Sequence, residues 1–76
     1  MNETKNNKRR KAKELIKQVS GKVKILRNKM KLTQEELEGK SGLTISRCES
    51  GKYDMTLTTV SILSKHLEVH PYELLK

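Results

Sequence analysis

The sequence predicts an all-α fold, a compact bundle of five helices that forms one small domain. The chain has 76 residues, which is too few for two domains. Its apolar residues recur at spacings of three and four, as one face of a helix requires, and no segment keeps the alternation of a strand. Caps made by Thr and Gly divide the second half into short helices. Since 33% of the residues are hydrophobic and none is Trp or Phe, we expect a thin aliphatic core.

The first predicted helix is long and basic and runs from Arg10 to about Lys31. Its apolar residues keep helical spacing throughout: Leu15, Ile16, Val19, Val23, Leu26 and Met30. Ser20-Gly21 interrupts this stripe without shifting its phase, so we expect a continuous or gently bent helix. Residues 1–9 are polar and lack periodicity, which predicts a disordered basic tail before a domain formed by residues 10–76.

The next two predicted helices are short. Thr33 can cap the second helix, with Glu36 completing a capping box, and the helix should end at Ser41-Gly42 because glycine suits a left-handed cap. Thr44 can cap a third helix from Ile45 to about Ser50, which glycine at position 51 stops. Two helices joined by a glycine-containing turn form a helix-turn-helix pattern over about residues 33–51.

Two further helices are predicted at the C-terminal end. Thr56 can cap a fourth helix, in which Leu57, Val60, Leu63 and Leu67 share one face. Val69-His70-Pro71 should end it. Since proline suits the first turn of a helix, Pro71 to Leu75 is predicted to form a fifth helix of a single turn.

Positive charge is concentrated in the first part of the chain. Residues 1–31 hold twelve Lys or Arg and two Glu, a balance of +10, whereas residues 32–76 hold five basic and seven acidic residues, a balance of −2. The chain is therefore a basic arm joined to a nearly neutral module. Such a field attracts polyanions, nucleic acid above all. A solvated basic tail that aids solubility is the alternative interpretation.

Four short stretches carry a family resemblance. Residues 32–37 read Leu-Thr-Gln-Glu-Glu-Leu, 40–43 Lys-Ser-Gly-Leu, 45–47 Ile-Ser-Arg and 49–52 Glu-Ser-Gly-Lys. This combination resembles the lambda-repressor and Cro-like (XRE) DNA-binding domain, over about residues 21–75. The resemblance implies a lambda-repressor-like bundle that binds double-stranded DNA with the second helix of the motif in the major groove. It further implies a cytoplasmic transcriptional regulator of bacterial or phage type, a repressor that acts as a homodimer.

The resemblance also implies residue roles. Gln34 would contact a phosphate, and Arg47 would reach a guanine edge, which its planar fork suits. Arg27 and Glu49 would form a structural ion pair between the first helix and the recognition helix. The other expected DNA contacts are Thr44, Ser46, Lys52, Tyr53, Lys40, Arg9 and Arg10.

Simpler interpretations of these residues stay open. Gln34 could serve as a helix-capping residue. Arg47 and Ser46 could be solvated surface residues, and Tyr53 could fold over the fourth helix.

Two departures from the family pattern lie in the motif. The distance from Gly42 to the run Thr44–Arg47 is shorter by about three residues, nearly one helical turn. Glu38 stands where the family has a small residue, and it should face water or a cation because a buried unpaired carboxylate is unfavourable. A shortened third helix could leave room for this larger side chain, or both changes could mark a motif that has lost direct base readout.

A second class of function is therefore open. The domain could be a degenerate helix-turn-helix that binds another protein, as an antitoxin-like module does, or a non-specific DNA binder that works through its basic arm. Val69, Tyr72, Leu74 and Leu75 should form an apolar patch at the C-terminal end. That patch either seals the core or makes the homodimer contact.

Catalysis, metal binding and membrane insertion are not expected. No Ser-His-Asp set, paired carboxylates or glycine-rich phosphate loop can be assembled, so the sequence does not predict an enzyme. Cys48, the only cysteine, should be a core residue, His66 should be exposed and His70 should cap the last helix, which leaves no metal or cofactor site. No apolar run exceeds two residues, far short of a membrane span. A small-molecule effector is not expected in a chain of this length.

Overall fold

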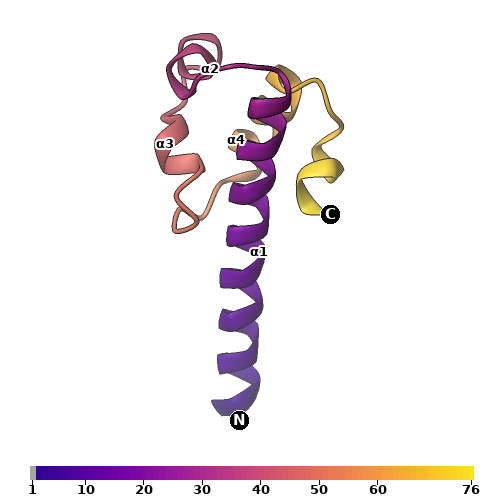
Figure 1. The fold of residues 1–76 in the computed structure, drawn as a ribbon. Coiled ribbons are helices and arrows are strands. Elements are labelled where there is room, and N and C mark those ends of the chain that lie inside the picture. Colours follow the sequence, from indigo (N-terminus) through magenta and orange to yellow (C-terminus); the bar gives the residue numbers. More distant parts are fainter. Residues whose placement is uncertain (1) are drawn as a thin grey trace.

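A computed structural model describes the backbone of residues 2–76 and the side chains of residues 12–76. Within this part, all regular secondary structure is helical, which confirms the all-α prediction. The elements are α1 (Asn2–Lys29), α2 (Gln34–Ser41), α3 (Ile45–Cys48), α4 (Leu57–His66) and the 3₁₀ helix η1 (Pro71–Leu75). The chain measures 45 × 21 × 20 Å, because α1 extends well beyond the body that packs around its C-terminal half (Figure 1).

Helix α1 is continuous through Ser20-Gly21, as the unbroken apolar stripe predicted. It begins at Asn2 rather than at Arg10, so residues 2–9, expected to belong to a disordered tail, continue the helix. The segment holds no glycine or proline, and turns can add to an existing helix without a new nucleation step. The helix ends at Lys29, two residues before Lys31 adopts a left-handed conformation with φ 58°.

The core is aliphatic and lies between the C-terminal half of α1 and the shorter helices. Helices α1 to α4, the turn after α4 and η1 all contribute: Val19, Val23, Leu37, Ile45, Cys48, Val60, Leu63, Leu67 and Leu74. The thiol of Cys48 is buried among these side chains, as predicted, and burial raises its pKa above the usual range. Since one fully buried Leu contributes about 1.5–3 kcal/mol, even so small a core holds the short helices in place.

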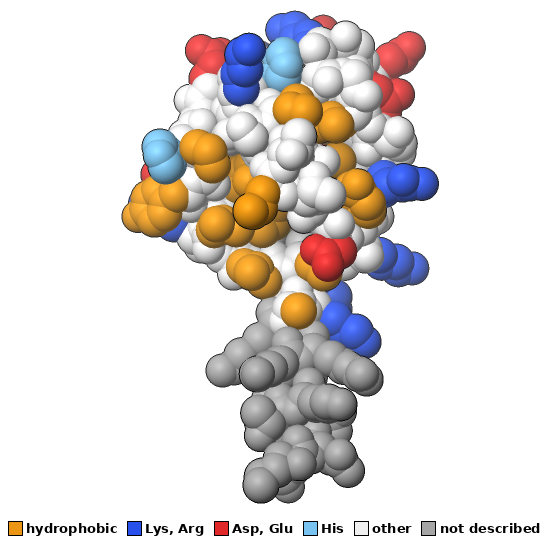
Figure 2. All heavy atoms as spheres, turned by 180° about the vertical axis from the view of Figure 1, so that it is seen from behind, with side chains coloured by type: hydrophobic (Ala, Val, Ile, Leu, Met, Phe, Trp, Pro, Cys, Tyr) orange, Lys and Arg blue, Asp and Glu red, His pale blue; other side chains and the backbone are white. Residues whose placement is uncertain are grey.

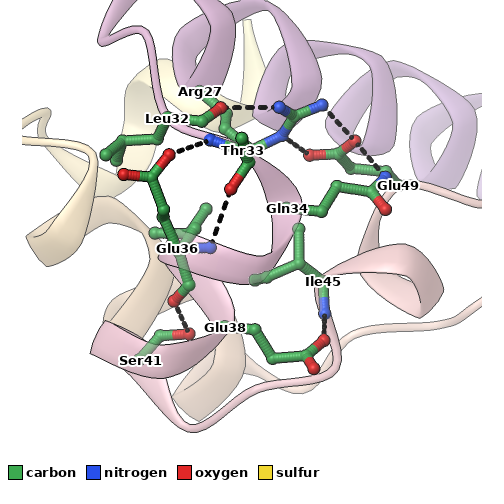
Figure 3. A network of polar contacts seen from close by, with 10 residues as sticks. Arg27, Leu32, Thr33, Gln34, Glu36, Glu38, Ser41, Ile45 and Glu49 are labelled. Carbon is green, nitrogen blue, oxygen red and sulfur yellow. Dashed lines mark hydrogen bonds and ion pairs between the residues drawn. The ribbon is translucent and has the colours of Figure 1, made fainter.

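Helix α2 has the predicted ends. The Thr33 hydroxyl accepts a hydrogen bond from the Glu36 N–H at 3.0 Å, and the Thr33 N–H donates to the Glu36 carboxylate at 2.9 Å. This capping box is confirmed (Figure 3). At the other end Gly42 has φ 74° and its N–H donates to the Glu38 carbonyl at 2.8 Å, so the left-handed cap is also confirmed.

The later helices differ from prediction mainly in length. Helix α3 ends at Cys48 instead of near Ser50, and α4 ends at His66 instead of near Val69. Thr56 caps α4 as predicted, by accepting from Thr59 N–H at 3.1 Å. The last turn is a 3₁₀ helix; His70 caps it through Nδ1, which accepts from Tyr72 N–H at 3.2 Å.

Candidate functional site

A buried ion pair joins three elements at the centre of the candidate site. The Arg27 guanidinium, on α1, donates from Nε to Glu49 Oε2 at 2.6 Å and from Nη2 to Oε1 at 3.0 Å. Its Nη1 donates to the Leu32 carbonyl, just before α2, at 2.7 Å. The Arg27 and Glu49 side chains are only 9% and 3% exposed. The bidentate contact between Arg27 and Glu49 holds the end of α3 against α1, and the bond to Leu32 adds the start of α2 (Figure 3).

The ion pair keeps both groups charged. Hydrogen bonding to Glu49 raises the pKa of Arg27. Burial on its own favours a neutral Glu49, but the hydrogen bonds from Arg27 and Gln34 outweigh burial and hold the pKa of the Glu49 carboxyl below its usual range. Removing either partner would leave the other as an uncompensated buried charge.

Gln34 belongs to the same network. Its Nε2 donates to Glu49 Oε1 at 2.9 Å, so its side chain is held across the start of α2 and the end of α3 (Figure 3). Neither simple capping nor a free side chain describes it. Gln34 stays exposed at the surface, and its phosphate contact remains a prediction.

The turn between α2 and α3 is closed by a carboxylate. Thr44 precedes α3, but its hydroxyl makes no capping hydrogen bond, so the cap predicted there is wrong. The Ile45 N–H donates instead to Glu38 Oε1 at 3.0 Å (Figure 3). Glu38 is exposed, as expected. The Glu38 carboxylate therefore caps the N-terminal end of α3.

Arg47 lies on the outer side of α3. Ile45 and Cys48 point into the core, which leaves Ser46 and Arg47 exposed. The Arg47 guanidinium carbon lies over the Tyr53 ring, 5.4 Å from its centre. Tyr53 is half-buried and packs against the core. Its ring therefore offers a fixed surface on which the Arg47 guanidinium lies. This cation–π contact connects residues whose pairing no local sequence signal indicates.

The helix-turn-helix family model matches residues 23–74, more than half of the chain. The match runs from the C-terminal half of α1 to η1 and includes the whole Arg27–Glu49 network. This chain belongs to the lambda-repressor and Cro-like helix-turn-helix family. Comparisons with curated proteins and with solved structures returned no match.

In this helix-turn-helix domain, α2 and α3 are two consecutive helices joined by the turn at Gly42, in the segment where the sequence predicts the motif. Thr44, Arg47 and Tyr53 lie together around a shallow hollow over the α2–α3 turn. Lys52 is exposed in the loop after α3, and Lys40 is exposed in the last turn of α2. The side chains of Arg9 and Arg10, also expected to contact DNA, lie outside the described residues.

Other expected features can be placed as well. Among the described residues, no group of three His, Cys, Asp or Glu side chains is arranged to hold a metal ion. His66 is half-buried rather than exposed, because it lies in the last turn of α4 beside the core residue Leu67. No described helix is both long and apolar enough to cross a bilayer.

Proposed function

We propose that this helix-turn-helix domain is a transcriptional regulator that reads double-stranded DNA and acts as a repressor in the cytoplasm. The main observation that supports this proposal is the hydrogen-bond network of Arg27, Glu49 and Gln34. A four-residue helix has little stability of its own, and this network anchors its C-terminal end while Glu38 caps its N-terminal end. The domain thus keeps a rigid outward face at the position where the family inserts its recognition helix.

Arg47 is the base reader in this proposal. Among the described side chains, none forms a hydrogen bond with its guanidinium, and a cation held over a ring keeps its in-plane N–H groups free. Those donors match O6 and N7 of guanine, a contact that discriminates against other bases by about 1–3 kcal/mol. Since only Ser46 and Arg47 face outward from α3, each domain reads one or two base pairs.

Phosphate contacts supply the remaining affinity. Lys52 follows the recognition helix, Lys40 lies at the end of α2, and Thr44 offers a hydroxyl at the turn, all of them exposed. Gln34, oriented by Glu49, presents the rest of its carboxamide at the start of α2. Contacts of this kind set the register of the domain on the duplex without reading sequence.

A homodimer would place two such domains on a two-fold symmetric site. Leu15, Leu57 and Leu75 are 44%, 84% and 47% exposed and surround an apolar hollow between α1, the loop before α4, α4 itself and η1. Hydrophobic side chains gather on this face (Figure 2). We propose that a second copy contacts it. Of the apolar patch expected from sequence, Leu74 is fully buried and seals the core, whereas Tyr72 and Leu75 are exposed.

The same apolar face favours a second candidate function, a module that binds another protein. A partner would cover Leu15, Leu57 and Leu75, and binding would not need Arg47. No cofactor or small-molecule effector enters either proposal, and neither involves catalysis.

Selection of bound duplexes from a random DNA pool tests the primary proposal. We expect enrichment of a palindrome with one guanine per half-site, and we expect Arg47→Ala to erase the preference at that position only. If no sequence is enriched although the protein binds DNA, the regulator proposal is wrong in its specific form and binding is driven by charge.

A further inference from the structure

Three exposed lysines form a ridge on one flank of α1. Lys17 and Lys24 are seven residues apart, two helical turns, and therefore lie almost in line along the helix. Lys13 lies one turn before Lys17. The sequence places all three in the basic arm but does not indicate which neighbouring element they face.

The structure places this ridge beside the loop that follows the recognition helix. A Cβ added to Gly51 would lie 3.6 Å from Cγ of Lys17, so the stem of that lysine passes directly over the loop. Lys24 is near enough to Glu49, at the end of α3, for its charge to lower the pKa of that carboxyl. The ridge therefore lies next to the end of α3 and the loop after it, the same loop that carries Lys52.

No apolar side chain lies between Lys17 and Lys24 along the ridge. Gly21 lies between Lys17 and Lys24 on this flank, and a Cβ there would meet nothing within 4 Å. Protein–protein interfaces gain most of their binding energy from buried aromatic or apolar anchors, which this surface lacks. Figure 2 shows Lys and Arg side chains along one edge of the body, down to where α1 leaves it, while hydrophobic side chains occupy the other part of the face.

We propose that the ridge of Lys13, Lys17 and Lys24 is a second DNA-contacting surface, which binds the sugar-phosphate backbone next to the groove occupied by α3. Eleven residues separate Lys13 from Lys24, a rise of about 16 Å, and one strand of B-DNA carries about five phosphates over that length. The inference rests on the proposed function. It adds that α1, outside the helix-turn-helix motif, lies along the duplex and supplies affinity that does not depend on sequence.

A matched pair of double variants tests the ridge. Lys17→Gln/Lys24→Gln removes two charges from the ridge. Lys22→Gln/Lys29→Gln removes two charges from the same helix with the same seven-residue spacing, but about 140° around its axis. Binding to one unselected duplex is measured by fluorescence anisotropy over a salt series. We expect the slope of log K against log salt to become shallower by about 2 in the ridge variant, since each phosphate contact contributes about 0.9, and to change little in the control.

Three further results make the test decisive. Equal changes of slope in both double variants would overturn the ridge, because only net charge would then matter. Wild-type protein that binds no duplex even at low salt would reject the proposed function itself. Wild-type protein that binds poly-glutamate as tightly as the duplex would also overturn the ridge as a DNA surface.

A charge-preserving variant separates binding from folding. Lys17→Arg/Lys24→Arg keeps both charges and should retain the wild-type slope, whereas a loss there would contradict a role based on phosphate charge. Thermal melting followed by circular dichroism checks that Lys24→Gln, which removes a cation near Glu49, leaves the domain folded.

Discussion

At the scale of single residues, the Arg27–Glu49 pair connects α1, the segment before α2 and the end of α3. Both charged groups are buried, and Glu49 also accepts a hydrogen bond from Gln34. The pairing of Arg27 with Glu49 was expected from the family resemblance, whereas the participation of Gln34 was not. A glutamine at a helix start has several possible partners, and only the packing of α3 against α2 selects Glu49.

Arg27→Ala should destabilise the fold before it affects DNA contacts. It leaves the Glu49 carboxylate buried and unpaired, which costs about 3–5 kcal/mol. We expect Arg27→Ala/Glu49→Ala to be more stable than Arg27→Ala alone, because the double variant removes the orphaned charge. Urea unfolding followed by circular dichroism measures both. A wild-type urea midpoint in Arg27→Ala would refute this role.

The same carboxylate predicts loss of stability in acid. The pKa of Glu49 in the folded protein lies below its usual range, so its stabilising contribution is complete above the unfolded value of about 4.3. It is lost as the pH falls through the lower, folded pKa. Chemical denaturation at a series of pH values from neutral to 3 should show a decline below about pH 4.3. A free energy of unfolding that stays constant over this range would contradict the assignment.

Tyr53 should act on DNA readout through Arg47. We expect Tyr53→Ala to release the guanidinium and to weaken preference for the selected duplex over a shuffled one, with little change in binding to the shuffled duplex. Tyr53→Phe keeps the ring and should behave like wild type, because the cation–π contact does not need the hydroxyl. Equal loss of affinity for both duplexes, or a defect in Tyr53→Phe, would instead indicate a phosphate contact through the hydroxyl.

At the scale of elements, a helix end could be predicted where the residues that form its cap are close together in the sequence. The Thr33–Glu36 box spans four consecutive residues, and Gly42 supplies the left-handed conformation by itself. The cap of α3 could not be predicted in this way, because Glu38 reaches Ile45 across a turn whose shape depends on tertiary packing. Thr44 has the right residue type and position, yet its hydroxyl does not make the bond.

Glu38→Ala should therefore destabilise the domain although the residue is exposed. Loss of a helix cap costs about 0.5–2 kcal/mol. Glu38→Gln keeps a side-chain oxygen that can accept from Ile45 N–H and should lose less. Thr44→Ala is the matched control, expected to remain near wild type in urea unfolding. If Thr44→Ala were the more damaging substitution, the cap would belong to Thr44.

At the scale of the whole molecule, the sequence predicts the order and number of helices. It does not predict which exposed side chains of different elements lie next to one another. Apolar periodicity in α1 indicates its buried face, and the surplus of Lys and Arg indicates a polyanionic partner. Neither indicates that Lys17 lies over Gly51 or that Arg47 lies over Tyr53. Those contacts depend on how the loop after α3 packs against α1, which is a tertiary property.

The shorter elements lie on two sides of α1. Helix α3 and its following loop lie on one side of α1 in Figure 1, and η1 with the C-terminus lies on the other. The first side carries the exposed Arg47 and Lys52. On the second side η1 carries the exposed Leu75, but the apolar hollow beside Leu75 is also lined by loop residues Tyr53, Asp54 and Met55.

The most direct test of sequence-specific DNA binding is the affinity ratio between a selected duplex and its shuffled counterpart, measured over rising salt for wild-type protein and Arg47→Ala. Non-specific affinity falls with salt for both duplexes, whereas discrimination through base contacts persists. We predict that the wild-type ratio stays above one across the series and that Arg47→Ala lowers it about 5- to 150-fold, the equivalent of one guanine contact. A ratio of one at every salt concentration, unchanged by the substitution, would contradict the account.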